Sequence, residues 1–339
     1  MGEAKREKGY TLVELLISAV LGLVVVGGAA TLMRQGLYVS SSLGQRAEMQ
    51  QNARAALNLI TRDLSLAGMG IPLGGIQLPD GGSAGESRFA CDFDDCYVAN
   101  NVYADRRLHS VRPADGLGPS VEGEATDMLT LVYRDLDSDL DQRELAGIAA
   151  DGTRIQFDTA VASEVAKLSA GDVVVICNLN GCAAAVVTGF SGTSVSLETG
   201  DPLGMNQPLA DLGTVRSLAD PAPLEGVYPP SRAFRVVVVT YYLESVTSQL
   251  MRQVNAHPPA TVAENLDDLQ FTYDIFDTST STATAALPDA GGLSNQIRKA
   301  NIVLRARSPR RALFESTYQQ IALSTSVSTR NLTFRDRYE

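Results

Sequence analysis

The chain opens with an abrupt change from charged to apolar residues. Residues 1–9 read MGEAKREKG, and from Tyr10 to Leu32 the sequence is almost continuously apolar. Because about 20 apolar residues span a bilayer as a helix, residues 10–33 are predicted to form a transmembrane segment. The basic residues that precede this segment favour a cytoplasmic location for residues 1–9 and export of the remainder.

After residue 33 the apolar positions become sparser, but residues 34–67 keep the spacing of an amphipathic helix. Gly68 and Gly70 allow a left-handed cap, and Pro72 prevents continuation. We therefore expect one helix from Thr11 to Ala67, roughly 85 Å long at 1.5 Å per residue. Its apolar stripe comprises Leu37, Leu43, Ala47, Ala53, Ala56, Leu57, Ile60, Leu64 and Ala67, whereas Arg46, Glu48, Arg54 and Asp63 are assigned to polar positions.

The residues beyond Pro72 predict antiparallel strands, because several short segments alternate apolar and polar side chains. A sheet of this kind would cover the apolar stripe of the helix. The prediction is an α+β fold, in which a long N-terminal transmembrane helical spine packs on an antiparallel β-sheet head that is enlarged by an extra β-rich region. The expected strands are residues 128–133, 154–157, 172–176, 183–187, 194–197, 234–243, 249–254, 269–276 and 297–307.

Three segments rich in Gly, Pro, Ser, Thr or Ala predict loops, namely residues 73–90, 201–232 and 277–295. The stretch after Pro202 is the expected boundary between two β lobes. The predicted organisation is a leader (1–9), a transmembrane half (10–33) and an amphipathic half (34–67) of the spine, a β-rich region with loops (68–200), a linker (201–232) and a C-terminal β region (233–339).

An acidic residue, Glu14, lies inside the apolar segment. An ionisable group in hydrocarbon costs about 3 kcal/mol, so Glu14 needs a partner. A new amine on Tyr10, created by cleavage before the apolar segment, would supply one. The amine could belong to the same chain or to a neighbouring helix, and in the second case the pair would set the axial register of adjacent helices.

The sequence GYTLVELL at residues 9–16 resembles the class III prepilin signature, a Gly before the cleavage point and a Glu five residues into the mature chain. The resemblance implies that a prepilin peptidase cuts after Gly9 and methylates the amine of Tyr10, and that Glu14 serves assembly. The family usually has Phe where this chain has Tyr10, which bears on methylation more than on cleavage. A membrane anchor followed by a coiled-coil stalk would explain the helix length, but not Gly9 and Glu14.

Three C-terminal segments resemble PilW-type minor pilins: residues 241–243, 262–271 and 327–332, interpreted as a hairpin, a turn into a strand and the final strand. The resemblance implies a non-enzymatic subunit that primes or caps a type IV pilus. Its partners would be other minor and major pilins through the N-terminal helix, prepilin peptidase and an inner-membrane assembly platform. The chain would cross the inner membrane once, with a periplasmic head, and then enter a pilus at the cell surface.

Two other functions are also consistent with the sequence. A type II secretion pseudopilin of the tip complex would share the leader and the spine. A pilus-tip adhesin would use the head as a binding module.

The four cysteines fall into two short-range pairs. Cys177 and Cys182 flank an Asn-Gly turn between two apolar segments, so they are expected to face each other at a hairpin end and form a disulfide. Cys91 and Cys96 would close a similar loop. A four-thiolate zinc site is the alternative, but zinc knuckles have two residues between paired cysteines and these pairs have more.

An alternating acidic loop suggests a calcium site. Its carboxylates recur every second residue, as hard oxygen ligands do in calcium loops, and are supplied by Asp135, Asp137, Asp139 and Asp141, with Glu144 following. The match is imperfect, because Leu140 replaces the loop glycine and Ala146 the terminal acid. The alternative is a solvated acidic loop. No cofactor is otherwise required.

The remaining patterns favour no enzyme. Residues 81–85 match the G-x-S-x-G pattern of hydrolases, but they follow Pro79-Asp80 rather than a buried strand. The two histidines, His109 and His257, are expected at the surface. The net charge of -11 argues against a nucleic-acid partner, because such partners need clustered Lys and Arg.

Overall fold

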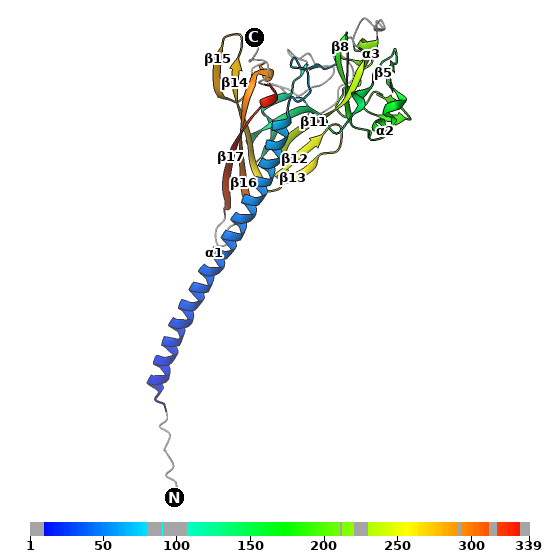
Figure 1. Ribbon diagram of the computed structural model, residues 1–339. Helices are drawn as coiled ribbons and strands as arrows, with labels where there is room; N and C mark the ends of the chain where they lie inside the picture. Colours follow the sequence, from blue (N-terminus) through cyan, green and yellow to red (C-terminus); the bar gives the residue numbers. More distant parts are fainter. Residues whose placement is uncertain are drawn as a thin grey trace.

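The computed structural model describes residues 10–79, 90, 107–121, 123–210, 212–219, 230–290, 293–311 and 317–332. One long helix, α1 (Leu12–Leu66), leads from the N-terminus into a β region that packs around its C-terminal end (Figure 1). The fold is α+β, with a long apolar N-terminal helix followed by antiparallel sheets, as the sequence predicts.

Both ends of α1 follow from local sequence. Thr11 is the N-cap, and its side chain accepts a hydrogen bond from the backbone N–H of Glu14. At the other end Gly68 and Gly70 have φ values of +84° and +68°, the left-handed conformation that favours glycine. The side-chain amide of Asn331 donates to the backbone oxygens of residues 65, 66 and 67, which have no partner within the helix. The predicted helix over residues 11–67 is confirmed.

The strands form three sheets, all of whose pairs are antiparallel apart from β1 with β8. The large sheet contains β1 (Ile76–Gln77), β2 (Arg107–Leu108), β3 (Val111–Val121), β4 (Glu124–Arg134), β7 (Val173–Asn178), β8 (Gly181–Val186), β11 (Arg232–Glu244), β12 (Gln249–Val254) and β13 (Ala260–Ala263). The small sheet contains β5 (Leu145–Ile148), β6 (Arg154–Phe157), β9 (Gly189–Ser191) and β10 (Ser194–Ser196). The C-terminal sheet contains β14 (Leu266–Asp277), β15 (Thr282–Leu287), β16 (Ile297–Arg311) and β17 (Tyr318–Ser328).

Strand β11 connects the two ends of the large sheet. Val236 pairs with Arg134 of β4 on one side and with Val173 of β7 on the other. Farther along, Val239 pairs with β4 and with Val254 of β12. One edge of β11 therefore holds β7 and then β12. Residues 201–232 do not separate two β lobes, since strands before and after them share one sheet.

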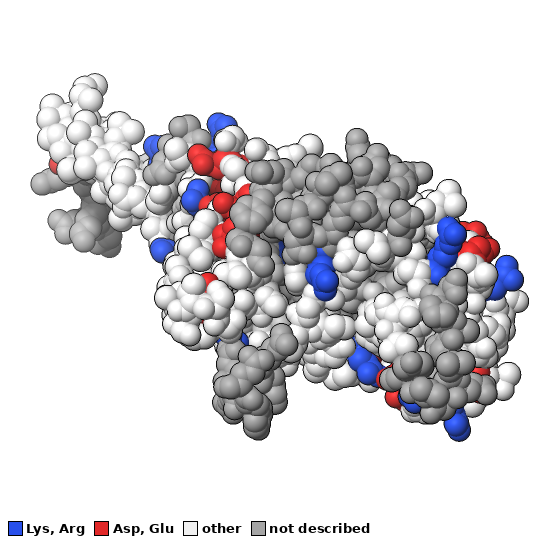
Figure 2. All heavy atoms as spheres, turned by 90° about the horizontal axis from the view of Figure 1, so that it is seen from above, with Lys and Arg blue, Asp and Glu red and all other residues white. Residues whose placement is uncertain are grey.

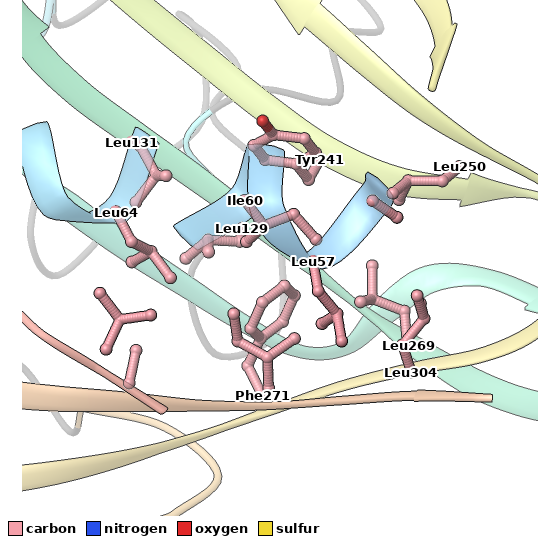
Figure 3. Packing of buried hydrophobic residues seen from close by; sticks show 14 of the residues in the cluster. Leu57, Ile60, Leu64, Leu129, Leu131, Tyr241, Leu250, Leu269, Phe271 and Leu304 are labelled. Atoms are coloured by element: carbon pink, nitrogen blue, oxygen red, sulfur yellow. The ribbon is translucent and has the colours of Figure 1, made fainter. Parts of the chain in front are cut away.

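The main core lies where α1 passes between two sheets (Figure 3). Leu57, Ile60 and Leu64 of the helix pack against side chains of β4, β11 and β12 on one side and of β14 and β16 on the other. The labelled sheet residues are Leu129, Leu131, Tyr241, Leu250, Leu269, Phe271 and Leu304. Burial of the helix begins at Met49, so Leu37, Leu43 and Ala47 of the predicted apolar stripe are exposed.

Strands β7, β8, β1 and β2 form one half of the large sheet, which we call the distal half. This half is covered on both faces. Val174 and Ile176 of β7 face a core shared with the small sheet and the short helices α2 (Ala162–Val165) and α3 (Val215–Ala219). Val173 and Val175 face a second core with β1, β2 and the segment around Leu203. A strand buried on both faces reads as a continuous apolar run, which explains the sequence VVVI.

The expected strands occur, with β6 and β12 at the predicted bounds. Other predictions were wrong. Residues 277–295 are not only a loop, because they contain β15, and 201–232 contain α3. The final strand, β17, ends at Ser328, and residues 330–332 form a short 3-10 turn that places Asn331 at the end of α1.

Candidate functional site

The N-terminal half of α1 is an apolar surface, and within the described part of the chain all of its residues from 12 to 33 are exposed. In the described part of the chain, α1 is the one helix long and apolar enough to cross a membrane, and none of its apolar window is buried. We call residues 12–33 the apolar half and residues 49–66, which pack in the main core, the head half. The hydroxyls of Ser18 and Thr31 are bonded within the helix, since they donate to the backbone oxygens of Glu14 and Gly27.

Glu14 takes part in a capping box at the start of α1. Its carboxylate accepts hydrogen bonds from the backbone N–H and the hydroxyl of Thr11, both at 3.2 Å. The hydroxyl of Thr11 lies 3.3 Å from the backbone nitrogen of Glu14, which donates to it. Tyr10 precedes this cap and is 87% exposed. Glu14 itself remains exposed.

Asp63 is a carboxylate of α1 that lies in the head half. It is 1% exposed and accepts hydrogen bonds from the hydroxyls of Tyr133 (3.1 Å) and Tyr241 (2.6 Å). The guanidinium of Arg252 contacts it through Nε and Nη2, both at 2.9 Å. A negative charge near a helix C-terminus is unfavourable, and these donors compensate for it. The cluster joins the helix to β4, β11 and β12.

The tyrosines of this cluster are held in the neutral form. Burial, with the negative charge of Asp63 beside it, raises the pKa of Tyr133 to about 12. The same two causes raise the pKa of Tyr241 still further. Both hydroxyls therefore remain hydrogen-bond donors to Asp63 at any physiological pH.

The sequence assigned Asp63 to the polar face of the helix, and this assignment is wrong. The signal was available, because Asp63 is three residues after Ile60 and four before Ala67, both in the apolar stripe. Positions three and four apart lie on one helix face. Nothing local distinguished an aspartate with buried partners from a solvated one, because Tyr133, Tyr241 and Arg252 come from distant strands.

Cys177 and Cys182 form a disulfide across the β7–β8 hairpin, where they are paired residues in the strand register. This prediction is confirmed. Gly9, Cys91, Cys96 and the G-x-S-x-G segment at 81–85 lie outside the described residues.

The acidic loop after β4 does not form the predicted calcium site. Asp135 forms an ion pair with Arg235 (2.9 Å), and Asp141 forms one with Arg134. The other three carboxylates of the loop, those of Asp137, Asp139 and Glu144, are exposed. Among the described residues, no group of three or more His, Cys, Asp or Glu side chains could hold a metal ion. Arg134 and Arg235 neutralise two of the five acids, and the spacing of acidic residues along the loop did not reveal these ion pairs.

Neither histidine is a simple surface residue. His109 is 6% exposed, so its predicted surface position is wrong. His257 is partly buried, and its Nε2 lies 3.0 Å from Asp172, whose other oxygen accepts the backbone N–H of Ser169. The pair fixes the turn after β12 against the start of β7.

The view along the molecule from above shows small mixed groups of basic and acidic side chains on a mostly uncharged surface (Figure 2). Among the residues that are not grey, the basic side chains do not gather into one large area on this face.

Comparison with known proteins gives one match. Residues 4–30 match the family described as the prokaryotic N-terminal methylation motif. No curated protein and no solved structure matches the chain. The motif contains Gly9, Tyr10 and Glu14, and the helix that carries it is long and apolar enough to span a membrane. The methylation motif supports a type IV pilin-like or pseudopilin protein, and the long apolar helix and the antiparallel β region fit a membrane-anchored protein of that kind.

Proposed function

We propose that this protein is a minor pilin, a structural subunit that primes or caps a type IV pilus after cleavage of its leader. The observation that carries the proposal is the contrast within α1. Its apolar half is exposed along its whole length, although its head half is buried between two sheets. A surface of this kind is covered by lipid before assembly and by the helices of other pilins afterwards.

Maturation would begin with prepilin peptidase, which cuts after Gly9 and methylates the amine of Tyr10. The free carboxylate of Glu14 then has two kinds of partner. In the single chain it bonds to Thr11. In a filament the amine of a neighbouring Tyr10 would pair with it, because an ion pair inside an apolar bundle is favoured over an unpaired charge.

Cleavage is tested by replacing Gly9 with a bulky residue such as Leu. The variant should stay at the precursor size beside the mature wild type on a gel, and mass analysis of its N-terminus should find the leader. A mature N-terminus at Tyr10 in this variant would contradict the proposal.

Pairing of Glu14 is tested by the amount of each variant in sheared pili. Glu14→Ala should be cleaved normally but incorporated weakly, because it cannot accept the neighbour's amine. Thr11→Ala is the matched variant, since it removes the local cap and keeps the carboxylate, and it should be incorporated well. Glu48→Ala controls for loss of an exposed carboxylate on the same helix. Equal losses in Thr11→Ala and Glu14→Ala would assign Glu14 to capping alone.

The PilW-type assignment rests on the sequence resemblance of the C-terminal segments, and two of these segments have defined places in the fold. Residues 262–271 run from β13 through a turn at Asn265, whose φ is +58°, into β14. Residues 327–332 carry the end of β17 and Asn331, which caps α1.

In this proposal the chain crosses the inner membrane once, with a cytoplasmic leader and a periplasmic β region, and passes through the assembly platform into the pilus. Its partners are other minor and major pilins. A type II secretion pseudopilin of the tip complex and a pilus-tip adhesin are the rival functions. Loss of attachment by piliated cells after changes in the distal half of the large sheet would favour the adhesin, whereas loss of pili favours priming.

A further inference from the structure

The hairpin of β16 and β17 is the part of the β region that reaches closest to the apolar half of α1 (Figure 1). The side-chain amide of Gln319, the second residue of β17, donates to the hydroxyl of Ser42 at 2.8 Å. Ser42 is nine residues after Met33, which is about 13 Å along a helix. The described end of this hairpin, formed by the paired residues Arg311 and Tyr318, therefore lies just outside the bilayer when the apolar half is inserted.

This end of the hairpin is cationic. Arg310 and Arg311 are exposed, and within the described residues neither forms an ion pair. The guanidiniums of Arg307 and Arg311 lie 5.1 and 5.6 Å from the centre of the Tyr318 ring. Arg307 is already paired with Asp267 at 3.2 Å, so the two arginines after it supply the uncompensated charge. The whole chain, by contrast, has a net charge of -11.

The spine contributes a third arginine on the membrane side. Arg34 is exposed on α1 directly after the apolar half, eight residues before Ser42, and so about 12 Å below it. The headgroup layer of one leaflet is roughly 5–8 Å thick. The phosphate groups of that leaflet thus lie between Arg34 and the end of the hairpin. Tyr318 suits this level, because tyrosine is enriched at membrane interfaces.

We propose that Arg310, Arg311 and Tyr318, with Arg34 beneath them, form a docking surface for the headgroups of anionic phospholipids. The guanidiniums bind the phosphate oxygens, which suits their planar arrangement of donors. Contact at the hairpin, away from the helix axis, fixes the orientation of the β region over the bilayer. The surface acts while the chain is membrane-inserted, so this inference holds for a pilin or a pseudopilin and does not depend on filament assembly.

The absence of tryptophan from the chain provides the test. Thr317→Trp places a single donor beside the hairpin end, at an exposed residue outside the docking surface. The full-length protein is placed in nanodiscs that carry a dansyl group on a fraction of the headgroups, with either neutral or anionic phospholipid as the bulk lipid. Energy transfer from the tryptophan then reports the distance to the headgroups. Phe190→Trp in β9 is the control, since it is 46% exposed in the distal part of the β region.

Transfer from residue 317 should be higher in anionic than in neutral nanodiscs. This difference should disappear in 1 M salt, where the Debye length is about 3 Å, and in the Arg310→Gln/Arg311→Gln variant. Transfer from residue 190 should not respond to any of these changes, and both arginines are exposed, so the variant should fold.

Equal transfer from residue 317 in the two lipids, or a difference that survives the double substitution, would overturn the proposal. If the double variant instead enters filaments poorly while lipid charge has no effect, the arginines contact acidic groups of a neighbouring subunit, and the lipid assignment is likewise wrong.

Discussion

The two ends of α1 each carry one carboxylate on an otherwise apolar surface, and the two carboxylates differ in their burial and in their hydrogen-bond partners. Asp63 is enclosed and meets three donor side chains from β4, β11 and β12. Glu14 is exposed, and among the described residues its carboxylate hydrogen-bonds only to Thr11, three residues away. The first carboxylate is satisfied within the chain, and the second retains the capacity to bind a group from outside it. The head half is thus stabilised by contacts within the chain, whereas in the proposed function the apolar half is covered by other molecules.

The largest expected effect on folding comes from Asp63→Ala. Removal of one partner from a buried ion pair leaves Arg252 without its counter-charge, so the free energy of unfolding should fall by about 3–5 kcal/mol. Denaturant unfolding of the full chain in detergent, followed by circular dichroism, measures this change. Glu48→Ala, on an exposed carboxylate of the same helix, should change it by less than about 0.5 kcal/mol. Similar losses in both variants would contradict a special role for Asp63.

The β region that encloses the head half contains a group whose protonation changes with pH. Asp127 of β4 is buried, and burial raises its pKa from the ordinary value of 3.8 to about 6. The backbone N–H groups of Gly116 and Phe271 donate to its carboxylate and lower the pKa, but by less than burial raises it. Because the folded state binds the proton more tightly, the stabilisation is complete below pH 3.8 and is lost as pH rises through 6. The change amounts to about 3 kcal/mol.

Asp127→Asn isolates this effect, since the amide does not titrate. The difference in unfolding free energy between the wild type and the variant, measured at several pH values from 4 to 7, should shift in favour of the variant as pH rises. Other carboxylates titrate in both proteins and cancel in the difference. A constant difference across this range would show that Asp127 does not titrate there.

A smaller effect is expected at the C-terminus of α1. Asn331→Ala removes the amide that donates to three backbone oxygens, and should lower the unfolding free energy by about 1 kcal/mol. Asn331→Asp has the same shape but no donor and adds a negative charge at the helix C-terminus, so it should be at least as destabilising. An unchanged thermal midpoint in the aspartate variant would show that Asn331 does not cap the helix.

The smallest effect on folding belongs to Glu14→Ala, although its effect on assembly should be large. In the described structure the carboxylate of Glu14 hydrogen-bonds only to Thr11, so its loss should change the unfolding free energy of the β region by less than about 0.5 kcal/mol. A destabilisation comparable to that of Asp63→Ala would erase the distinction between the two ends.

The sequence predicted the parts of the fold whose signals are local. The extent of α1 followed from apolar spacing and from Gly68, Gly70 and Pro72, and the hairpin disulfide followed from an Asn-Gly turn between cysteines. Strand β3 was missed because Pro113, Gly116, Gly118 and Pro119 read as loop, yet Pro113 and Gly118 pair with Leu129 and Thr126 of β4, with a register shift on each side of Gly118.

The roles of polar side chains depended on distant partners. Asp63 and Asp141 both looked like solvated or metal-binding acids, and both meet arginines that no spacing could bring to them. Glu14 was the exception, because a carboxylate in a membrane-length apolar segment is anomalous without reference to any other residue.

Strand β11 has a mechanical consequence. It pairs with β7 of the distal half and with β4 and β12 over α1, so no peptide linker separates the two halves of the large sheet. Bending one half against the other would have to deform the hydrogen-bond ladders that β11 forms with β4 and with β7. A force applied to the distal half would therefore be transmitted through the continuous strand β11 to the sheet that packs on α1, so the two halves should move as one rigid unit.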